Sequence, residues 1–389
     1  MVLLGRPDDS FDLVLVGGGL QNGLIALSAL HHRPDCRIAL VEAESTLGGN
    51  HTWCVHAADV PSEAHAWFDP LIVKRWPGYD VRFPNLVRTL DSPYAVVSSS
   101  HFAQVVTAAF AANSHWKLST GKRATRIDAQ AVSLDDGTTL RGSLVIDARG
   151  PDLASASTRC GFQKFLGLEC RTAQPHGVLR PMLMDATCSQ HDGFRFFYVL
   201  PLETDRLLIE ETRFSRASSL DVSAARAGIE AYAAGAWPIV EILREERGIL
   251  PMPWADAVAV SMSSSPVIAG YRGGYFHPAT GYSLPAALRV ASLVGTHVTE
   301  QLFEEDWRAF QRRHRAQVLY AHQLNRLLFT GFADRDMWGV FERFYRLPED
   351  LIARFYAMSM SVADRARLLI GRPPPGFSLS RALLAGAGP

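Results

Sequence analysis

The chain lacks an excess of charge of either sign. Its 389 residues include 39 Lys and Arg and 39 Asp and Glu, so the formal net charge is zero. Proteins that bind nucleic acid usually carry a surplus of basic residues. The balanced charge therefore argues against a nucleic-acid partner, and the 48% hydrophobic content is typical of a globular protein with one large domain or two interleaved domains.

Cysteine is scarce and is not spaced for a structural framework. The five cysteines are Cys36, Cys54, Cys160, Cys170 and Cys188, an odd number without a CxxC pair. A disulfide scaffold or a zinc site would normally show paired spacings. Since no cluster of His and Cys is present either, we expect no metal site and a reduced protein.

Long hydrophobic runs are also missing. No stretch approaches the roughly 20 apolar residues that span a bilayer. The acidic residues Asp8, Asp9 and Asp12 crowd the first apolar run, which argues against a signal peptide. We expect a cytoplasmic protein without a spanning segment, and attachment to a membrane surface stays open.

The segment FDLVLVGGGLQNGLIALSAL predicts a strand, a glycine turn and a helix. Gly17 and Gly19 supply the first two glycines of a GxGxxG signature, where the backbone can approach a pyrophosphate at a helix N-terminus. Asn22 replaces the third glycine, so either the packing is looser or Gly23 takes that place. Glu42 ends the next apolar strand, where an acid would meet a ribose hydroxyl. We expect nucleotide binding; the alternative is a purely structural turn.

Later segments favour FAD over NAD as the nucleotide. The run EAESTLGG places Gly48 and Gly49 after the acid, and LVIDARG at 144–150 is typical of a strand that returns to a flavin domain. The glycine-rich loop GYRGGYFHPATGYSL at 270–284, which contains Gly281 and Tyr282, has the density and position to meet the flavin ring. Tyr271 stands where many flavoproteins have an acid.

The pattern along the chain predicts an α/β fold in which an FAD-binding Rossmann-type domain is interleaved with a β-rich substrate domain and followed by a helical C-terminal part. We expect residues 1–80 to form the first FAD-binding portion. Residues 81–260 are expected to be mainly β-rich, with a return to the FAD domain near 100–150. Residues 261–300 would form the late FAD-binding loop and helix, and 301–389 the helical region. Within this plan, Ser100 is a candidate cap for a helix to about Phe110, and Asp136-Gly137 predicts a hairpin.

The stretch RLLIEETR at 206–213 combines an apolar strand with two adjacent carboxylates, Glu210 and Glu211. A buried carboxylate needs a partner or takes up a proton. Neighbours on a strand point to opposite faces, so only one of the two is expected to reach a substrate. Spacing cannot choose between them. The alternative is a pair of structural carboxylates matched with Arg206 and Arg213.

The sequence resembles the bacterial lycopene β-cyclases of carotenoid synthesis. The resemblance covers nearly the whole chain and rests on GGGLQNGL (17–24), GGNHTW (48–53), FRFFYVLPL (194–202), RLLIEET (206–212), FHPATGYSLP (276–285), NRLLF (325–329) and RFYRLPEDLIARFYA (343–357). It implies an FAD-dependent isomerase, or intramolecular lyase, that converts lycopene through γ-carotene to β-carotene without net redox change. It further implies that the FAD must be reduced, usually by NAD(P)H, and that Glu210 carries the essential role, while Glu211 either supports it or forms a structural ion pair.

Such a reaction needs an acid, a dry pocket and electron-rich surfaces that stabilise a carbocation. Candidates for the substrate-facing surface are Phe194, Phe196, Tyr198, Phe276, His277 and Tyr282, of which we expect two or three aromatics to contact the substrate. His51 and His277 are candidates for a flavin contact or a proton relay. Arg195 is expected to lie on the face opposite Phe194 and Phe196.

The substrate implied by this resemblance, like other acyclic carotenoids, resides in the bilayer. We therefore expect a peripheral association with the inner membrane. The segments 318–332 and 347–371 mix large apolar residues with arginines, a composition that suits either the membrane interface or packing against the protein's own core. Two other functions remain open: an FAD-dependent isoprenoid hydroxylase or double-bond reductase of the same fold, and a non-catalytic carotenoid- or flavin-binding protein.

Overall fold

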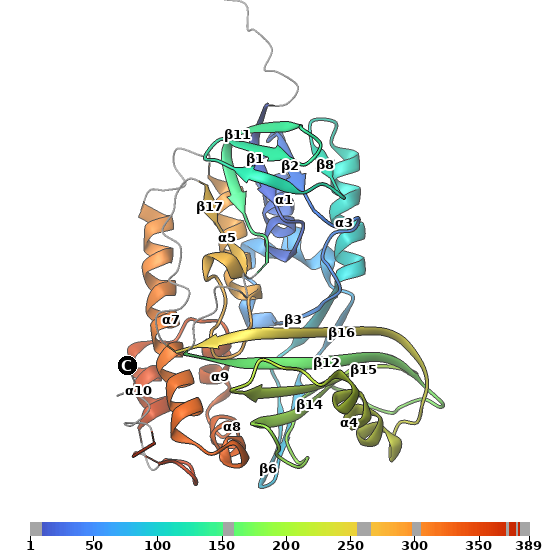
Figure 1. The fold of residues 1–389 in the computed structure, drawn as a ribbon, viewed down its shortest axis with the longest axis vertical. Coiled ribbons are helices and arrows are strands. Elements are labelled where there is room, and N and C mark those ends of the chain that lie inside the picture. The colour runs from blue at the N-terminus through green and yellow to red at the C-terminus, as the bar shows by residue number, and fades with distance from the viewer. Residues whose placement is uncertain are drawn as a thin grey trace, which may run out of the picture.

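The computed structural model describes residues 10–150, 159–254, 266–297, 305–370, 373–378 and 380–381. Figure 1 shows an α/β unit at the top, a broad curved sheet below it, and a column of helices along one side of both. Each of these three regions contributes to the candidate site described below.

The upper unit is built on a sheet with the strand order β8-β2-β1-β11-β10-β9, and β17 pairs with β11. The strands are β1 (Ser10–Val16), β2 (Ile38–Val41), β8 (Lys117–Ser119), β9 (Ala124–Ile127), β10 (Ala131–Leu134), β11 (Thr139–Asp147) and β17 (Val267–Ile268). β1 runs parallel to both β2 and β11, with Val16 opposite Val41 and Asp147. The carboxyl ends of three strands thus meet at one edge, where α/β sheets bind ligands.

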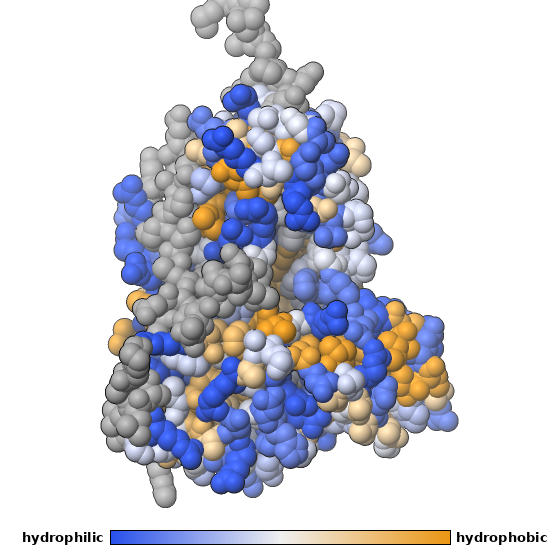
Figure 2. All heavy atoms as spheres, in the orientation of Figure 1, coloured by the Kyte–Doolittle hydropathy of each residue, from blue (hydrophilic) through white to orange (hydrophobic). Residues whose placement is uncertain are grey.

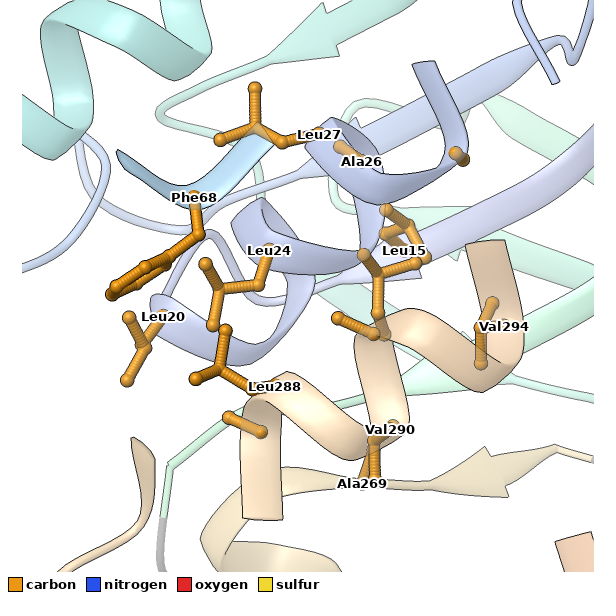
Figure 3. Close-up of a cluster of buried hydrophobic side chains, with 14 of the residues drawn as sticks. Leu15, Leu20, Leu24, Ala26, Leu27, Phe68, Ala269, Leu288, Val290 and Val294 are labelled. Carbon is orange, nitrogen blue, oxygen red and sulfur yellow. The ribbon is translucent and has the colours of Figure 1, made fainter. Parts of the chain in front are cut away.

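Helices cover this sheet and bury its apolar strands. They are α1 (Leu20–His32), α3 (Ser99–Ala112) and α5 (Leu284–Thr296). Figure 3 shows Leu24 of α1 and Leu288 of α5 pointing toward one another, with Leu15 of β1 and Phe68 nearby. These residues are almost completely buried. Their burial stabilises the packing of α5 against α1, although the two helices are far apart in the sequence.

The lower sheet has the order β16-β12-β15-β14-β13-β5-β6. Its strands are β5 (Tyr79–Phe83), β6 (Leu86–Leu90), β12 (Cys160–Thr172), β13 (Met182–Asp185), β14 (Phe194–Glu203), β15 (Arg206–Ser215) and β16 (Ile239–Pro253). Helix α4 (Val222–Ala234) covers one face through Ala225, Ile229 and Ala233. Figure 2 shows an apolar patch at the N-terminal end of β16, where Val240, Ile242 and Leu243 are exposed.

A small sheet with the order β3-β7-β4 adjoins both larger sheets. It consists of β3 (Thr52–His56), β4 (Lys74–Trp76) and β7 (Tyr94–Ser98). Between β3 and β4 lie the short helices η1 (Ala57–Asp59), η2 (Ser62–Ala64), α2 (His65–Phe68) and η3 (Asp69–Leu71). Thr52 lies opposite Ser98 at one end of this sheet and His56 lies opposite Tyr94 at the other. β3 thereby carries the chain from the nucleotide-binding edge to the second sheet.

The C-terminal part is helical, as predicted. After η5 (Gly270–Gly273) and α5 come α7 (Glu305–Gly331), η6 (Asp334–Asp336), α8 (Trp338–Phe344), α9 (Glu349–Tyr356) and α10 (Val362–Leu369). Many apolar residues of 318–332 and 347–357 pack inward, among them Val318, Phe329, Ile352 and Phe355. None of the helices among the described residues has the length and hydropathy needed to cross a bilayer.

The predicted α/β architecture with a Rossmann-type unit is confirmed, and two details differ. Helix α3 begins at Ser99, and Ser98 rather than Ser100 caps it by accepting a hydrogen bond from the His101 amide. Residues 100–150 do return to the first sheet, whereas β3 and β4, within 1–80, belong to the small sheet. Parts of the predicted 261–300 and 301–389 regions lie outside the described residues, and the domain boundaries stay a prediction.

Candidate active site

The glycine turn after β1 forms a shallow cradle at the start of α1. Gly17 has a φ of +98°, and a Cβ there would lie 2.9 Å from the Ala148 carbonyl oxygen. Gly19 is the N-cap of α1 and has no side-chain capping bond, and a Cβ there would meet no atom within 4 Å. Open space therefore faces the free amides of a helix N-terminus, an arrangement that binds phosphate groups.

Asn22 and Gly23 divide the role of the missing third glycine. The buried Asn22 amide donates to the carbonyl oxygens of Val16 and Gly17, at 2.9 and 2.8 Å, and so fixes the turn. A Cβ at Gly23 would lie 2.1 Å from the Phe102 ring. Gly23 therefore allows α1 and α3 to pack closely and does not line the cavity. The predicted contact of Gly23 with the cofactor stays a prediction, and its packing against Phe102 supports the cradle indirectly.

The other early residues of the predicted cofactor site converge on the same cradle. Glu42 follows β2 and accepts hydrogen bonds from the amides of Gly18, at 2.5 Å, and Glu44, at 2.8 Å. Gly48 and Gly49 adopt φ values of +77° and +61°, which suit glycine. All three predicted residues line the cavity described below. The site thus fits a dinucleotide, with amides for its pyrophosphate and an acid for a ribose.

The late loop contributes only part of what the sequence suggested. Gly281 and Tyr282 line the cavity, and the Tyr282 hydroxyl donates to Asp59 at 2.7 Å. Phe276 is instead buried in a stack with Tyr271, and His277 packs against Phe355. Burial lowers the pKa of His277 to about 3. Neither Phe276 nor His277 is among the residues that line the cavity, so the structure does not bring these two candidates to its surface.

A cavity of about 1010 Å³ joins this cradle to the second sheet and to the C-terminal helices. Its wall is apolar over most of its length, and it includes Phe165, Phe196, Tyr198, Phe214, Leu324, Phe341, Phe344, Leu368 and Phe377. Its charged lining residues lie mainly at the cradle (Glu42, Glu44, Lys122, Arg123 and Arg149), with Glu210 on β15 and Arg343 and Arg367 on the C-terminal helices. An elongated apolar molecule can therefore extend from the helices toward the cradle.

Glu210 opens into this cavity from the middle of β15. Its carboxylate is joined to the Thr212 hydroxyl by a hydrogen bond of 2.5 Å. The pKa of Glu210 is raised to about 8, chiefly by burial and in addition by the nearby Glu246 carboxylate, while the hydrogen bond from Thr212 opposes the increase. At neutral pH Glu210 therefore carries a proton on a carboxyl group that faces an apolar space.

Glu211 points to the opposite face of β15. It is 1% exposed and forms ion pairs with Arg195, at 2.6 Å, and with Arg213, at 2.5 Å. Arg195 lies on the face opposite Phe194 and Phe196, as predicted, and its guanidinium also stacks over Phe197. Glu211 does not line the cavity, and its two ion pairs favour the structural role over the catalytic one.

The aromatic residues of β14 divide into two groups. Phe196 and Tyr198 line the cavity, and Tyr198 lies directly opposite Glu210 in the sheet. Phe194 is fully buried and stacks on Phe341, so the structure does not bring this candidate to the cavity surface. The Tyr198 hydroxyl shares hydrogen bonds with Cys54, at 2.8 Å, and with Tyr94, at 3.2 Å.

Two residues of the site, Glu246 and His56, were missed from the sequence. Glu246 of β16 is buried near Glu210, and His56 lines the cavity from β3, as does the candidate His51 from the turn before it. Burial lowers the pKa of His51, which was proposed earlier as a flavin contact, and lowers that of His56 to about 3. Glu246 lies in the run EERG, which resembles an exposed charged strand. The sequence therefore did not indicate that Glu246 is buried beside Glu210.

Asp59 is a further buried acid close to the late loop. It accepts the Tyr282 hydroxyl and caps η1 by accepting from the His56 amide at 3.3 Å. Burial raises the pKa of Asp59 to about 7, and the hydrogen bonds from Tyr282 and His56 oppose the increase. The cluster anchors Tyr282 at the junction of the cradle and the apolar cavity.

Solved structures share this fold. A geranylgeranyl bacteriochlorophyll reductase-like protein of Thermoplasma acidophilum aligns with a TM-score of 0.63 at 12% identity, covering 92% of this chain and 96% of that one. PqsL of Pseudomonas aeruginosa, described as a probable FAD-dependent monooxygenase, aligns with a TM-score of 0.58 at 15% identity, covering 81% and 96%. At such identities the likeness concerns the fold alone.

Relatives in sequence are much closer. The lycopene beta-cyclase of Pantoea ananas is 42% identical over 368 residues, covering 94% of this chain and 95% of the relative. That of Pseudescherichia vulneris is 40% identical, covering 93% and 94%. A family model described as lycopene cyclase protein matches residues 12–382. With that match over nearly its whole length, the chain belongs to the lycopene cyclase family.

Proposed function

We propose that this chain is a lycopene beta-cyclase that converts lycopene through γ-carotene to β-carotene by a proton-initiated reaction without net redox change. The observation that carries the proposal is the position of Glu210. A protonated carboxyl group faces an apolar cavity that is continuous with a dinucleotide cradle. The names of the relatives supply the substrate.

The chemistry needs an unusually well-placed acid. A trisubstituted alkene is a very weak base, and its protonation creates a tertiary carbocation that a neighbouring double bond attacks. Loss of a proton from the closed ring then completes the isomerisation. Glu210 supplies the first proton, because burial keeps it protonated at neutral pH and the apolar wall excludes water that would trap the cation.

Aromatic rings beside Glu210 stabilise the positive charge as it forms. Phe196, Tyr198, Phe214 and Tyr94 line the cavity within the same region. An aromatic face contributes about 0.5–2 kcal/mol to binding a cation, with the larger values at dry sites. Tyr198 is held by Cys54 and Tyr94, so its ring is fixed before the substrate enters.

FAD is the dinucleotide that fits this proposal. Gly17 and Gly19 would face its pyrophosphate and Glu42 its ribose, while Gly281 and Tyr282 would meet its ring system from the late loop. When bound and reduced, at the expense of NAD(P)H, the flavin supplies an electron-rich surface beside a developing cation. Glu210 holds the proton, and the residues of the cradle orient the cofactor.

The substrate enters from a membrane surface at the C-terminal end of the cavity. Leu369 and Pro373 are exposed and also line the cavity, so the cavity reaches the surface there. Val362 and Ile370 are exposed close by, at 78% and 69%, and Arg367 is a basic neighbour. Apolar side chains beside a cation suit the interface of a bilayer.

The direct test incubates the purified protein with liposomal lycopene, FAD and a reductant, followed by chromatography and mass spectrometry of the pigment. Cyclisation yields a product with the mass of lycopene. A product whose mass has changed by oxygen or hydrogen would instead identify the FAD-dependent isoprenoid hydroxylase or reductase. Unchanged lycopene with bound pigment would identify a carotenoid-binding protein.

A further inference from the structure

Glu210 shares one row of the second sheet with a second carboxylate that no part of the sequence analysis identified. In the register of the sheet, Glu210 of β15 lies opposite Gly167 of β12, and Gly167 lies opposite Glu246 of β16. All three are on the face toward the cavity and β3. The residue between the two carboxylates has no side chain, so this position leaves room for Glu246 to lean over it, with Leu208 Cδ1 also close by.

The orientation of Glu246 is fixed by its partners. Its Oε2 atom accepts from Arg244, at 2.8 Å, and from the Thr52 hydroxyl, at 3.0 Å. A Cβ at Gly167 would lie 3.0 Å from Glu246 Cγ and 3.3 Å from its Oε1. The arginine therefore binds one side of the carboxylate, and the other side lies over Gly167 toward Glu210.

Other groups near Glu210 do not provide a comparable charge. Tyr198, Cys54 and Tyr94 form a hydrogen-bonded cluster, and burial raises the pKa of each, so all three are neutral near pH 7. Burial likewise lowers the pKa of His51 and favours its neutral form. On the same face of the sheet as Glu210, the other polar or charged side chains close to its row are Arg206 and Thr212 of β15, Glu169 of β12 and Arg244 of β16.

Glu169 carries the same type of charge but lies farther along the sheet. It sits opposite Leu208, two residues from the Glu210 row, and Arg206 and Arg244 bind it at 2.6 and 2.9 Å. Each of its oxygens thus has a cationic partner, whereas Arg244 and Thr52 bind only one side of Glu246. Glu169 is therefore a suitable control for Glu246, because it is a buried carboxylate that pairs with the same arginine, Arg244.

We propose that Glu246 is a positioning residue for the reaction, whose negative charge, transmitted across the gap at Gly167, keeps the Glu210 carboxyl group protonated for delivery to the substrate. Two carboxylates that share a site resist simultaneous ionisation, and the Arg244 guanidinium pairs with the Glu246 carboxylate at 2.8 Å. The inference rests on the proposed function of Glu210 as the acid.

The test measures protonation of Glu210 without relying on turnover. Infrared spectra of the flavin-loaded protein are recorded from pH 5 to pH 10, and the band of the protonated carboxyl group is assigned by its loss in Glu210→Gln. In Glu246→Gln we expect its pH midpoint to fall by about one unit, because a neighbouring negative charge is removed. The pH at which cyclisation activity declines on the alkaline side should fall by the same amount.

Glu169→Gln is the control, since it also removes a carboxylate from Arg244 and should leave the midpoint nearly unchanged. Gly167→Ala fills the gap, displaces Glu246 and should lower the midpoint. If Glu246→Gln does not fold, Glu246→Asp, which keeps the charge but withdraws it, should produce a smaller decrease. An unchanged midpoint in the folded Glu246 variants, or an equal shift in Glu169→Gln, overturns the proposal.

If the parent protein forms no β-carotene, the proposed function fails, while the infrared midpoints still decide the role of Glu246.

Discussion

Glu210 and Glu211 are adjacent in sequence and lie in opposite environments. Glu210 opens into the apolar cavity, whereas Glu211 is buried between Arg195 and Arg213 on the other face of β15. The alternation of a strand is sufficient to separate them. The two carboxylates therefore have different partners, and their substitution should have different consequences.

Replacing Glu210 with Gln should abolish most of the cyclase activity while the protein folds and binds flavin. An amide preserves the size of the side chain and its contact with Thr212, but it has no acidic proton to deliver. Loss of a general acid typically lowers the rate by about 10²–10⁴-fold. Initial rates with liposomal lycopene, measured at equal flavin content, check this expectation.

Glu211→Gln is the matched control and should chiefly affect stability. It leaves Arg195 and Arg213 without their charged partner, which should cost on the order of 3 kcal/mol, at the lower end for a broken buried pair because both arginines keep some access to water. Denaturant unfolding measures this loss. A Glu210→Gln protein with nearly parental turnover would contradict the assignment of the acid.

The pH dependence should follow the protonation of Glu210. Its pKa is raised to about 8, so cyclisation should persist below that pH and decline as the pH rises through it. Between the ordinary pKa of Glu and about 8 the folded state holds a proton that the unfolded chain has lost, so stability decreases as pH rises across this window.

Glu210→Gln removes that dependence and should raise the melting temperature relative to the parent more at pH 8 than at pH 4. Thermal unfolding at the two pH values tests this sign. An equal difference between the two proteins at both pH values would mean that Glu210 titrates normally.

Two glycines of the same turn should respond differently to valine. Gly19→Val places its side chain in open space, so the protein should fold and lose FAD because the approach of the pyrophosphate is blocked. Gly23→Val drives its side chain into Phe102 and should cost about 1–3 kcal/mol of stability. Flavin absorbance after gel filtration and denaturant unfolding distinguish the two; full flavin content in Gly19→Val would argue against the cradle.

Cyclisation should require reduced flavin and consume no reductant. Protonation at one carbon and loss of a proton at another leave the electron count of the substrate unchanged. Anaerobic assays with prereduced protein should therefore form many rings per flavin without added NAD(P)H. Oxidation of one NAD(P)H for every ring formed would exclude this mechanism.

Membrane attachment should depend on the apolar side chains at the C-terminal mouth. Val362→Glu and Ile370→Glu introduce charge beside the mouth and should reduce both sedimentation with anionic liposomes and turnover of liposomal lycopene. Val240→Glu alters an equally exposed apolar residue at the far end of β16 and serves as the control. If Val240→Glu reduces liposome binding and turnover as much as the substitutions at Val362 and Ile370 do, the docking surface lies elsewhere.

Local patterns predicted much of the fold because they depend on a few neighbouring residues. The Gly17 turn, the Asp136-Gly137 hairpin between β10 and β11, and the apolar strand around Ile209 all appear where the sequence indicated. The same patterns could not tell which glycine of the turn packs against a helix. Gly23 meets Phe102, almost 80 residues later, and that contact depends on how two helices are placed.

The candidate site was predictable only where it lies within a single segment. Strand alternation indicated that Glu210 and Glu211 separate, and the family resemblance rather than spacing selected Glu210. Glu246 was not found, because its place beside Glu210 depends on the register of three strands and on the missing side chain at Gly167. The stack of Phe194 on Phe341 of α8 could not be predicted either, because the two rings come from segments far apart in the sequence.

The continuity of the cavity from the C-terminal helices to Glu210 sets the order of events for a molecule with two identical ends. Under the proposed mechanism, only the end beside Glu210 reacts, while the other end lies toward the mouth. Formation of the second ring would then require the one-ring intermediate to withdraw, reverse and re-enter. Release should therefore precede completion, and an excess of fresh lycopene should compete with the returning intermediate and enrich the one-ring pigment.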